Sequence, residues 1–153
     1  MDLPQRSMTK KKIKLEFIDT FQQLDFPLCQ FRDYIQRICQ QEKIPVGSLR
    51  IITVDDEYLR SLHRKFIRDD SNTDVIVFPL DENTDKEAEI YISGDRARAN
   101  AKRYRVTLQK EMARLISHAL LHLQGYDDHS PHARKKMHSL EDRLLHQYWE
   151  STG

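Results

Sequence analysis

The sequence predicts an α+β fold in which helices pack against a single mixed β-sheet of about four strands. Two observations predict this fold class. Segments with the pattern of strands are interspersed with segments whose apolar residues recur at helical spacing. The chain has 153 residues, which allows one domain of ordinary size and leaves little room for a second. We expect one domain at residues 13–153, preceded by a flexible basic arm at residues 1–12.

Four segments have the pattern of strands. The first alternates apolar and polar residues, as a half-buried strand does. The second is the short run LRIITV, and an acidic turn separates the third run, DVIVFP, from the fourth, AEIYIS. The predicted strands are therefore residues 13–20, 49–54, 74–79 and 88–93.

Five segments have the pattern of helices. In the first, apolar residues recur at helical spacing from Leu28 to Ile38. The second begins with the acidic run from Asp55 to Glu57, which suits the positive end of a helix dipole. Pro131 suits the first turn of the last helix. The predicted helices are residues 25–45, 55–66, 97–104, 108–124 and 131–148.

The overall charge excludes a uniformly basic, histone-like nucleic-acid binder, because 25 Lys and Arg are balanced by 24 Asp and Glu. The charges are nevertheless segregated along the chain. Residues 96–114 contain seven Lys or Arg and one Glu, whereas residues 55–89 contain five basic and eleven acidic residues. The basic segment could follow an RNA backbone, with Tyr104 available for stacking on a base. A solvated helix face is the alternative interpretation of this segment.

Other classes of protein are excluded by composition. The polar N-terminus does not predict a secretory signal, and no apolar run is long enough to span a membrane. Four scattered glycines offer no glycine-rich phosphate loop. Cys29 and Cys39 are ten residues apart in a predicted helix, which fits reduced core thiols of a cytoplasmic protein.

Histidines near the end of the fourth predicted helix suggest a metal site. His118 and His122 are four residues apart and share one helix face, so both rings can bind one ion. The pair alone is also compatible with two hydrogen-bonded core histidines. Gly125 can end the helix and turn the chain back, which would bring Asp128 to the histidines as a third donor. His129 follows directly and is the alternative third donor.

The resulting pattern, H-x-x-x-H-x-x-G-x-x-D, has the ligand spacing of metzincin zinc proteases. Those enzymes carry a glutamate base after the first histidine, where this chain has Ala119. A metal-dependent hydrolase of another class, such as a protease, therefore remains an alternative without an evident base.

These residues resemble the YbeY endoribonucleases, which are bacterial factors for ribosomal RNA maturation. The specific part of the resemblance is the segment HALLHLQGYDD at residues 118–128, and weaker similarities are the blocks TDVIVFP at residues 73–79 and EIYIS at residues 89–93. Glu111 matches an acidic position of the family. The similarity extends over residues 46–148, whereas residues 1–45 match only in the expected order of elements.

The resemblance implies a zinc-dependent endoribonuclease that holds one Zn²⁺ and cleaves single-stranded RNA. It also implies action on the 3′ end of 16S rRNA, ribosome quality control, partners among ribosomal subunits and assembly factors, and a cytoplasmic location. Three protein ligands, His118, His122 and Asp128, would leave a fourth metal position for water or a phosphate oxygen. A non-catalytic ribosome-assembly factor is a further alternative.

The chain departs from the family pattern at three positions. Asp128 stands where most members have the third ligand as histidine, and Ala119 replaces a glycine. Arg68 follows Ile67, one residue later than an arginine of the family, so its role in holding phosphate is open. No catalytic residue is assigned; Glu111 and Asp127 are candidates for the general base.

Overall fold

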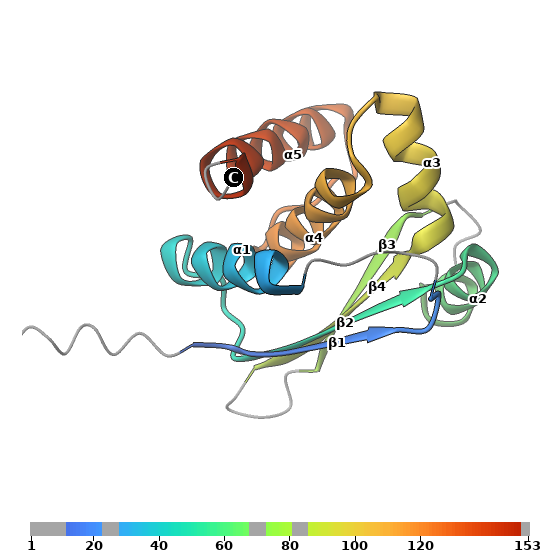
Figure 1. Ribbon diagram of the computed structural model, residues 1–153, viewed down its shortest axis with the longest axis horizontal. Helices are drawn as coiled ribbons and strands as arrows, with labels where there is room; N and C mark the ends of the chain where they lie inside the picture. The colour runs from blue at the N-terminus through green and yellow to red at the C-terminus, as the bar shows by residue number, and fades with distance from the viewer. Residues whose placement is uncertain (1–11, 23–27, 68–72, 81–85, 151–153) are drawn as a thin grey trace, which may run out of the picture.

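The computed structural model describes residues 12–22, 28–67, 73–80 and 86–150 (Figure 1). It contains a four-stranded mixed sheet in the order β1-β2-β4-β3. Strands β1, β2 and β4 are parallel, and β3 pairs with β4 in the antiparallel direction at the edge of the sheet. The predicted α+β class with one mixed sheet of four strands is confirmed. The strands are β1 (Lys14–Asp19), β2 (Ser48–Val54), β3 (Val75–Leu80) and β4 (Glu87–Ser93).

Helices lie on both faces of the sheet (Figure 1). The main core forms where α1, α4 and the C-terminal helical segment cover one face, and α2 packs on the other face over a smaller cluster around Leu59. The helices are α1 (Leu28–Gln41), α2 (Asp56–Ile67), α3 (Gly94–Tyr104), α4 (Leu108–Gln124), α5 (Pro131–Leu144) and the π-helical turn η2 (Leu145–Trp149).

Helix α4 is the central helix of the main core. Residues on its inner side, including Met112, Ile116 and Leu120, are almost completely buried, and the helix contacts β3, α3 and α5. Both ends of α4 are fixed locally. The side chain of Thr107 accepts a hydrogen bond from the backbone N–H of Lys110, and Gly125 ends the helix with a φ of 114°.

The observed elements differ from the predicted ones mainly at their ends. Helix α3 begins at Gly94, three residues earlier than predicted, because the side chain of Ser93 caps it by accepting from the Arg96 N–H. The last predicted helix continues from α5 into η2 with one wider turn. Most of the predicted basic arm, residues 1–11, lies outside the described residues. Within the described ranges, no helix combines the length and apolarity needed to cross a membrane.

Candidate metal centre

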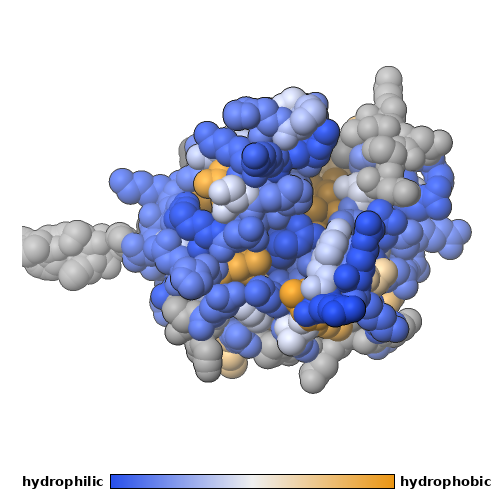
Figure 2. Space-filling model, turned by 90° about the horizontal axis from the view of Figure 1, so that it is seen from above, coloured by the Kyte–Doolittle hydropathy of each residue, from blue (hydrophilic) through white to orange (hydrophobic). Residues whose placement is uncertain are grey.

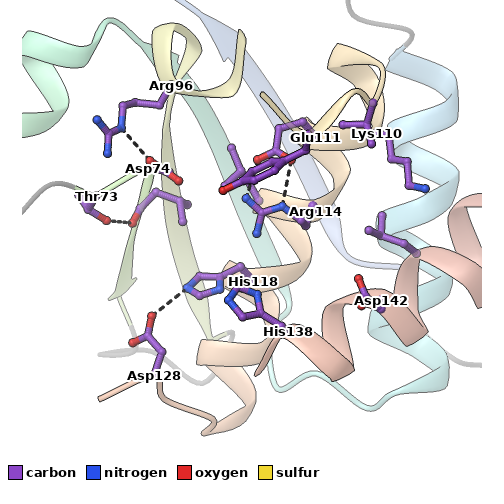
Figure 3. A pocket seen from close by; sticks show the side chains of 15 residues that line it. Thr73, Asp74, Arg96, Lys110, Glu111, Arg114, His118, Asp128, His138 and Asp142 are labelled. Atoms are coloured by element: carbon purple, nitrogen blue, oxygen red, sulfur yellow. Dashed lines mark hydrogen bonds and ion pairs between the residues drawn. The ribbon is translucent and has the colours of Figure 1, made fainter. Parts of the chain in front are cut away.

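The three ligands predicted from the sequence lie together at the C-terminal end of α4. Nε2 of His118 is 3.0 Å from Nε2 of His122, and Asp128 places Oδ2 3.5 Å from His118 Nε2 and Oδ1 4.0 Å from His122 Nε2. One donor atom from each residue lies within 4.8 Å of the other two. Figure 3 shows His118 and Asp128 pointing toward one another across the site.

This donor set fits a zinc ion. Tetrahedral coordination with bonds of about 2.0–2.2 Å separates neighbouring ligand atoms by about 3.3–3.6 Å. The three observed separations, 3.0, 3.5 and 4.0 Å, bracket that range. The chemistry fits as well, because two imidazoles and one carboxylate are ligands that Zn²⁺ accepts. Which metal this protein holds, and the role of each residue as a ligand, stay predictions.

The turn after α4 brings Asp128 to the histidines. Gly125 adopts a positive φ that a side chain would strain, and its N–H bonds to the His122 carbonyl. Asp127 then accepts a hydrogen bond from the His129 N–H, which closes the next turn. Asp127 is thus a turn residue, and His129 is exposed. Asp128, the predicted third ligand, is the turn residue with a donor atom within 4.8 Å of both histidines, whereas His129 lines the second cavity beside them.

Both histidines are poised for ligation by their surroundings. Burial, and next the neighbouring His118, lower the pKa of His122 below its ordinary value, which favours the neutral ring that a metal requires. The His122 ring also makes a hydrogen bond with the backbone of Tyr126. Nδ1 of His118 lies 2.5 Å from Oε2 of Glu141 on α5.

Glu141 belongs to a buried network behind the candidate metal ligands. Its other oxygen accepts from Nη1 of Arg114 at 3.1 Å, and Arg114 also binds both oxygens of Glu111. Both glutamates are only 1 % exposed. Burial by itself raises the pKa of Glu141, but the hydrogen bond from His118 and the charge of Arg114 outweigh it, so the pKa lies below its ordinary value.

Two cavities meet at the candidate metal site. The first, of about 700 Å³, extends toward α3 and α5 and is lined by Tyr104, Lys110 and Arg114 among others (Figure 3). The second, of about 830 Å³, extends along β3 and is lined by His63 among others. Four residues line both cavities: Thr73, Val75, His118 and Asp128. The candidate metal centre therefore lies in the middle of a longer depression.

A scan against family models decides the relationship of this chain to known proteins. The model described as "Endoribonuclease YbeY" matches residues 17–149. The chain belongs to the YbeY endoribonuclease family. The resemblance inferred from the sequence is confirmed. The match begins at residue 17, well before residue 73, where the first of the similar sequence blocks begins.

Relatives in the YbeY family agree with this assignment. Endoribonuclease YbeY of Chlorobaculum parvum is 38% identical over 111 residues, which cover 72% of this chain and 79% of the relative. Endoribonuclease YbeY of Cytophaga hutchinsonii is 36% identical over 117 residues, covering 76% and 82%. The solution structure of TM1509 from Thermotoga maritima superposes with a TM-score of 0.55 at 23% identity, covering 90% of this chain and 93% of that one, and so shares the fold.

Three further residues singled out in the sequence lie in different places. Glu111 lines the first cavity, but its carboxylate is paired with Arg114, and Asn100 donates to it as well. Ala119 is fully buried in the core. Arg68 lies outside the described residues. The sequence did not indicate that Glu141 belongs to the site. Glu141 lies 23 residues beyond His118 and reaches that histidine only because α5 packs on α4.

Proposed function

We propose that the protein is a zinc-dependent endoribonuclease that cleaves single-stranded RNA, with ribosomal RNA as its substrate. The observation that carries this proposal is the His118, His122 and Asp128 triangle at the junction of two cavities, in a chain of the YbeY family. When bound, the metal would supply an activated water and neutralise charge on the scissile phosphate.

The shape of the site favours cleavage inside a strand. His118 and Asp128 line both cavities, so a bound strand can continue on either side of the reacting phosphate. An exonuclease needs a wall that stops the chain end, whereas among the described residues the depression continues past the candidate metal site. The volumes of the two cavities are also those of small-molecule pockets, which favours one strand with splayed bases over a duplex.

Positive charge near the first cavity supports a phosphate-binding role. Lys102, Arg103 and Arg105 are exposed at the end of α3, next to the exposed Tyr104 that lines the cavity. Other basic residues of the 96–114 segment are engaged within the protein, since Arg96 pairs with Asp74 and Lys110 with Glu150. The proposed RNA track is therefore the end of α3. The face seen in Figure 2 is largely hydrophilic, which suits a charged ligand.

In the proposed reaction the side chains of the site have distinct tasks. His118, His122 and Asp128 hold the metal, and the cationic end of α3 aligns the backbone. Glu111, whose carboxylate is paired with Arg114, is assigned no task in the reaction. We propose further that the substrate is the 3′ region of 16S rRNA, that the protein acts in ribosome quality control with ribosomal subunits and assembly factors, and that such work places it in the cytoplasm.

The test is cleavage of a single-stranded RNA labelled at both ends. The wild-type protein loaded with Zn²⁺ should release internal fragments, and EDTA should stop the reaction until Zn²⁺ is restored. His118→Ala and His122→Ala should lose at least 100-fold in rate. His146→Ala is the control, because His146 is 87% exposed on η2. Intact RNA with the loaded wild type would overturn the proposal.

The same preparations separate the two alternatives. A protease would cleave an unstructured protein substrate in the presence of Zn²⁺. An assembly factor would bind ribosomal subunits equally well whether the protein had first been freed of metal or loaded with Zn²⁺. Ala119 offers no base for peptide hydrolysis, because its side chain is a buried methyl group.

A further inference from the structure

We infer that Glu141 is a positioning residue that sets the tautomer of His118 and so presents Nε2 of that ring to the metal. The inference rests on the proposed metal site and concerns a residue outside the three ligands. Three contacts carry it: Glu141 to His118, Glu141 to Arg114, and Arg114 to Glu111.

The hydrogen bond between Glu141 and His118 determines which ring nitrogen is free. A carboxylate only accepts, so Oε2 of Glu141 at 2.5 Å requires the proton of the neutral ring to be on Nδ1. Nε2 then carries a lone pair, and it is this atom that faces His122 and Asp128. In the other tautomer Nε2 would carry a hydrogen and could not bind a metal.

Glu141 cannot easily leave this position. Its side chain is 1 % exposed, and Oε1 accepts from Nη1 of Arg114 at 3.1 Å. Arg114 is itself fixed by two bonds to Glu111, and Oε2 of Glu111 also accepts from Asn100 on α3 at 3.1 Å. The carboxylate that orients His118 on α4 is therefore held from both α4 and α3, although it belongs to α5.

The substitution Glu141→Gln tests this geometry sharply. The Gln side chain has almost the same shape, but only one of its two terminal atoms accepts. Because Arg114 can only donate, the amide oxygen should turn toward Arg114 and the amide NH₂ toward His118. The NH₂ donates to Nδ1, which moves the ring proton to Nε2 and blocks the ligand atom.

The matched control is Glu111→Gln. Glu111 is equally buried and binds the same arginine, but Glu141, and not Glu111, contacts His118. Loss of a buried charge in the network is common to both variants, whereas loss of the His118 orientation is specific to Glu141→Gln. Far-UV circular dichroism and thermal melting establish that each variant is folded.

The measurements are the Zn²⁺ dissociation constant, by competition with a chromophoric chelator, and the ¹⁵N spectrum of His118 in metal-free protein. Glu141→Gln should weaken Zn²⁺ binding about 10- to 100-fold, and Glu111→Gln by less than about 3-fold. The wild-type spectrum should show the proton on Nδ1, and that of Glu141→Gln should show it on Nε2.

Three other results would contradict the role of Glu141. Equal losses in the two variants, an unchanged affinity in Glu141→Gln, or a wild-type ring protonated on Nε2 would overturn the inference. The wild-type spectrum decides the matter even if Glu141→Gln does not fold. A wild-type protein that binds no Zn²⁺ would overturn the proposed function and the inference together, whereas normal wild-type binding with an unchanged variant would overturn the inference alone.

Discussion

The hydroxyl of Tyr34 on α1 lies 2.5 Å from Oγ of Ser117, the residue that precedes His118 on α4. Both side chains are fully buried. Ser117 donates to the carbonyl of Ala113, so it accepts from Tyr34. Burial raises the pKa of Tyr34 above its ordinary value, which keeps this donor protonated. The contact thus ties α4, the helix that carries His118 and His122, to α1 through one hydrogen bond.

Removal of this hydroxyl by Tyr34→Phe should destabilise the protein by about 1 kcal/mol, because Ser117 loses one partner and retains the other. For a chain of this length that corresponds to a fall in melting temperature of about 2–4 °C. Thermal unfolding followed by circular dichroism measures it. Tyr104→Phe is the control, since Tyr104 is 53% exposed, and it should melt as the wild type does. Equal melting of Tyr34→Phe and wild type would contradict the prediction.

Asp128, and not the adjacent His129, should be the third metal ligand. An oxygen of Asp128 lies 3.5 Å from His118 Nε2, whereas His129 is exposed in the turn. Asp128→Ala should therefore weaken Zn²⁺ binding at least 100-fold, and His129→Ala should leave it within about 3-fold of wild type. Isothermal titration of metal-free protein with Zn²⁺ compares the two. A larger loss in His129→Ala would assign the third ligand to the histidine.

Glu42 should contribute to a loss of stability in acid. It accepts two hydrogen bonds from Arg143 and one from the hydroxyl of Tyr148, so it joins the end of α1 to α5 and η2. The bond from Arg143 holds the pKa of Glu42 below its ordinary value; burial opposes this shift, and the bond from Tyr148 adds to it. A lowered folded-state pKa gives stabilisation that is complete above the unfolded pKa and is lost as the pH falls through the folded one.

Glu42→Gln should consequently be less stable than wild type at pH 7, by about 1 kcal/mol because Arg143 is half exposed, and the difference should shrink toward pH 3. Urea unfolding at a series of pH values measures this dependence. In an Arg143→Gln background the same change should have a smaller effect. A stability difference that stays constant from pH 7 to pH 3 would rule out the carboxylate as its source.

Gly94 should resist substitution because it lies against an aromatic ring. A Cβ at this position would overlap the ring of Phe21, which is itself only 8% exposed. Gly94→Ala should cost about 1–3 kcal/mol through displacement of that ring, despite the better helix propensity of alanine. Urea unfolding of Gly94→Ala, Phe21→Leu and the double variant checks the cause. Additive losses would show that the two positions do not interact.

The elements were largely predictable from local patterns, and α4 was predicted to the residue because periodicity and the turn glycine agree there. Positions set by long-range packing were not predictable in the same way. The early start of α3 depends on the Ser93 cap, and the wide turn at η2 accompanies the burial of Leu145, Tyr148 and Trp149 in one core. Neither feature follows from the helical period alone.

The candidate site likewise contains residues that local sequence predicts and one that depends on packing between helices. His118, His122 and Asp128 were predictable because a rigid helix and one turn fix their relative positions. Glu141 was not, since its partnership with His118 depends on how α5 crosses α4. The positive charge of residues 96–114 was predictable, but which of these side chains are available to RNA was not. Ion pairs within the protein engage three of them: Arg96 with Asp74, Lys110 with Glu150, and Arg114 with Glu111.

The burial of Ala119 also limits how this helix could change during evolution. Ala119 is adjacent in sequence to His118 of the candidate metal site, yet its side chain belongs to the core and is fully shielded from solvent. A glutamate introduced there would place an unpaired carboxylate among apolar side chains, at a cost of several kcal/mol. One substitution could therefore not turn this helix into that of a zinc protease, because the side chain that follows His118 lies in the apolar core.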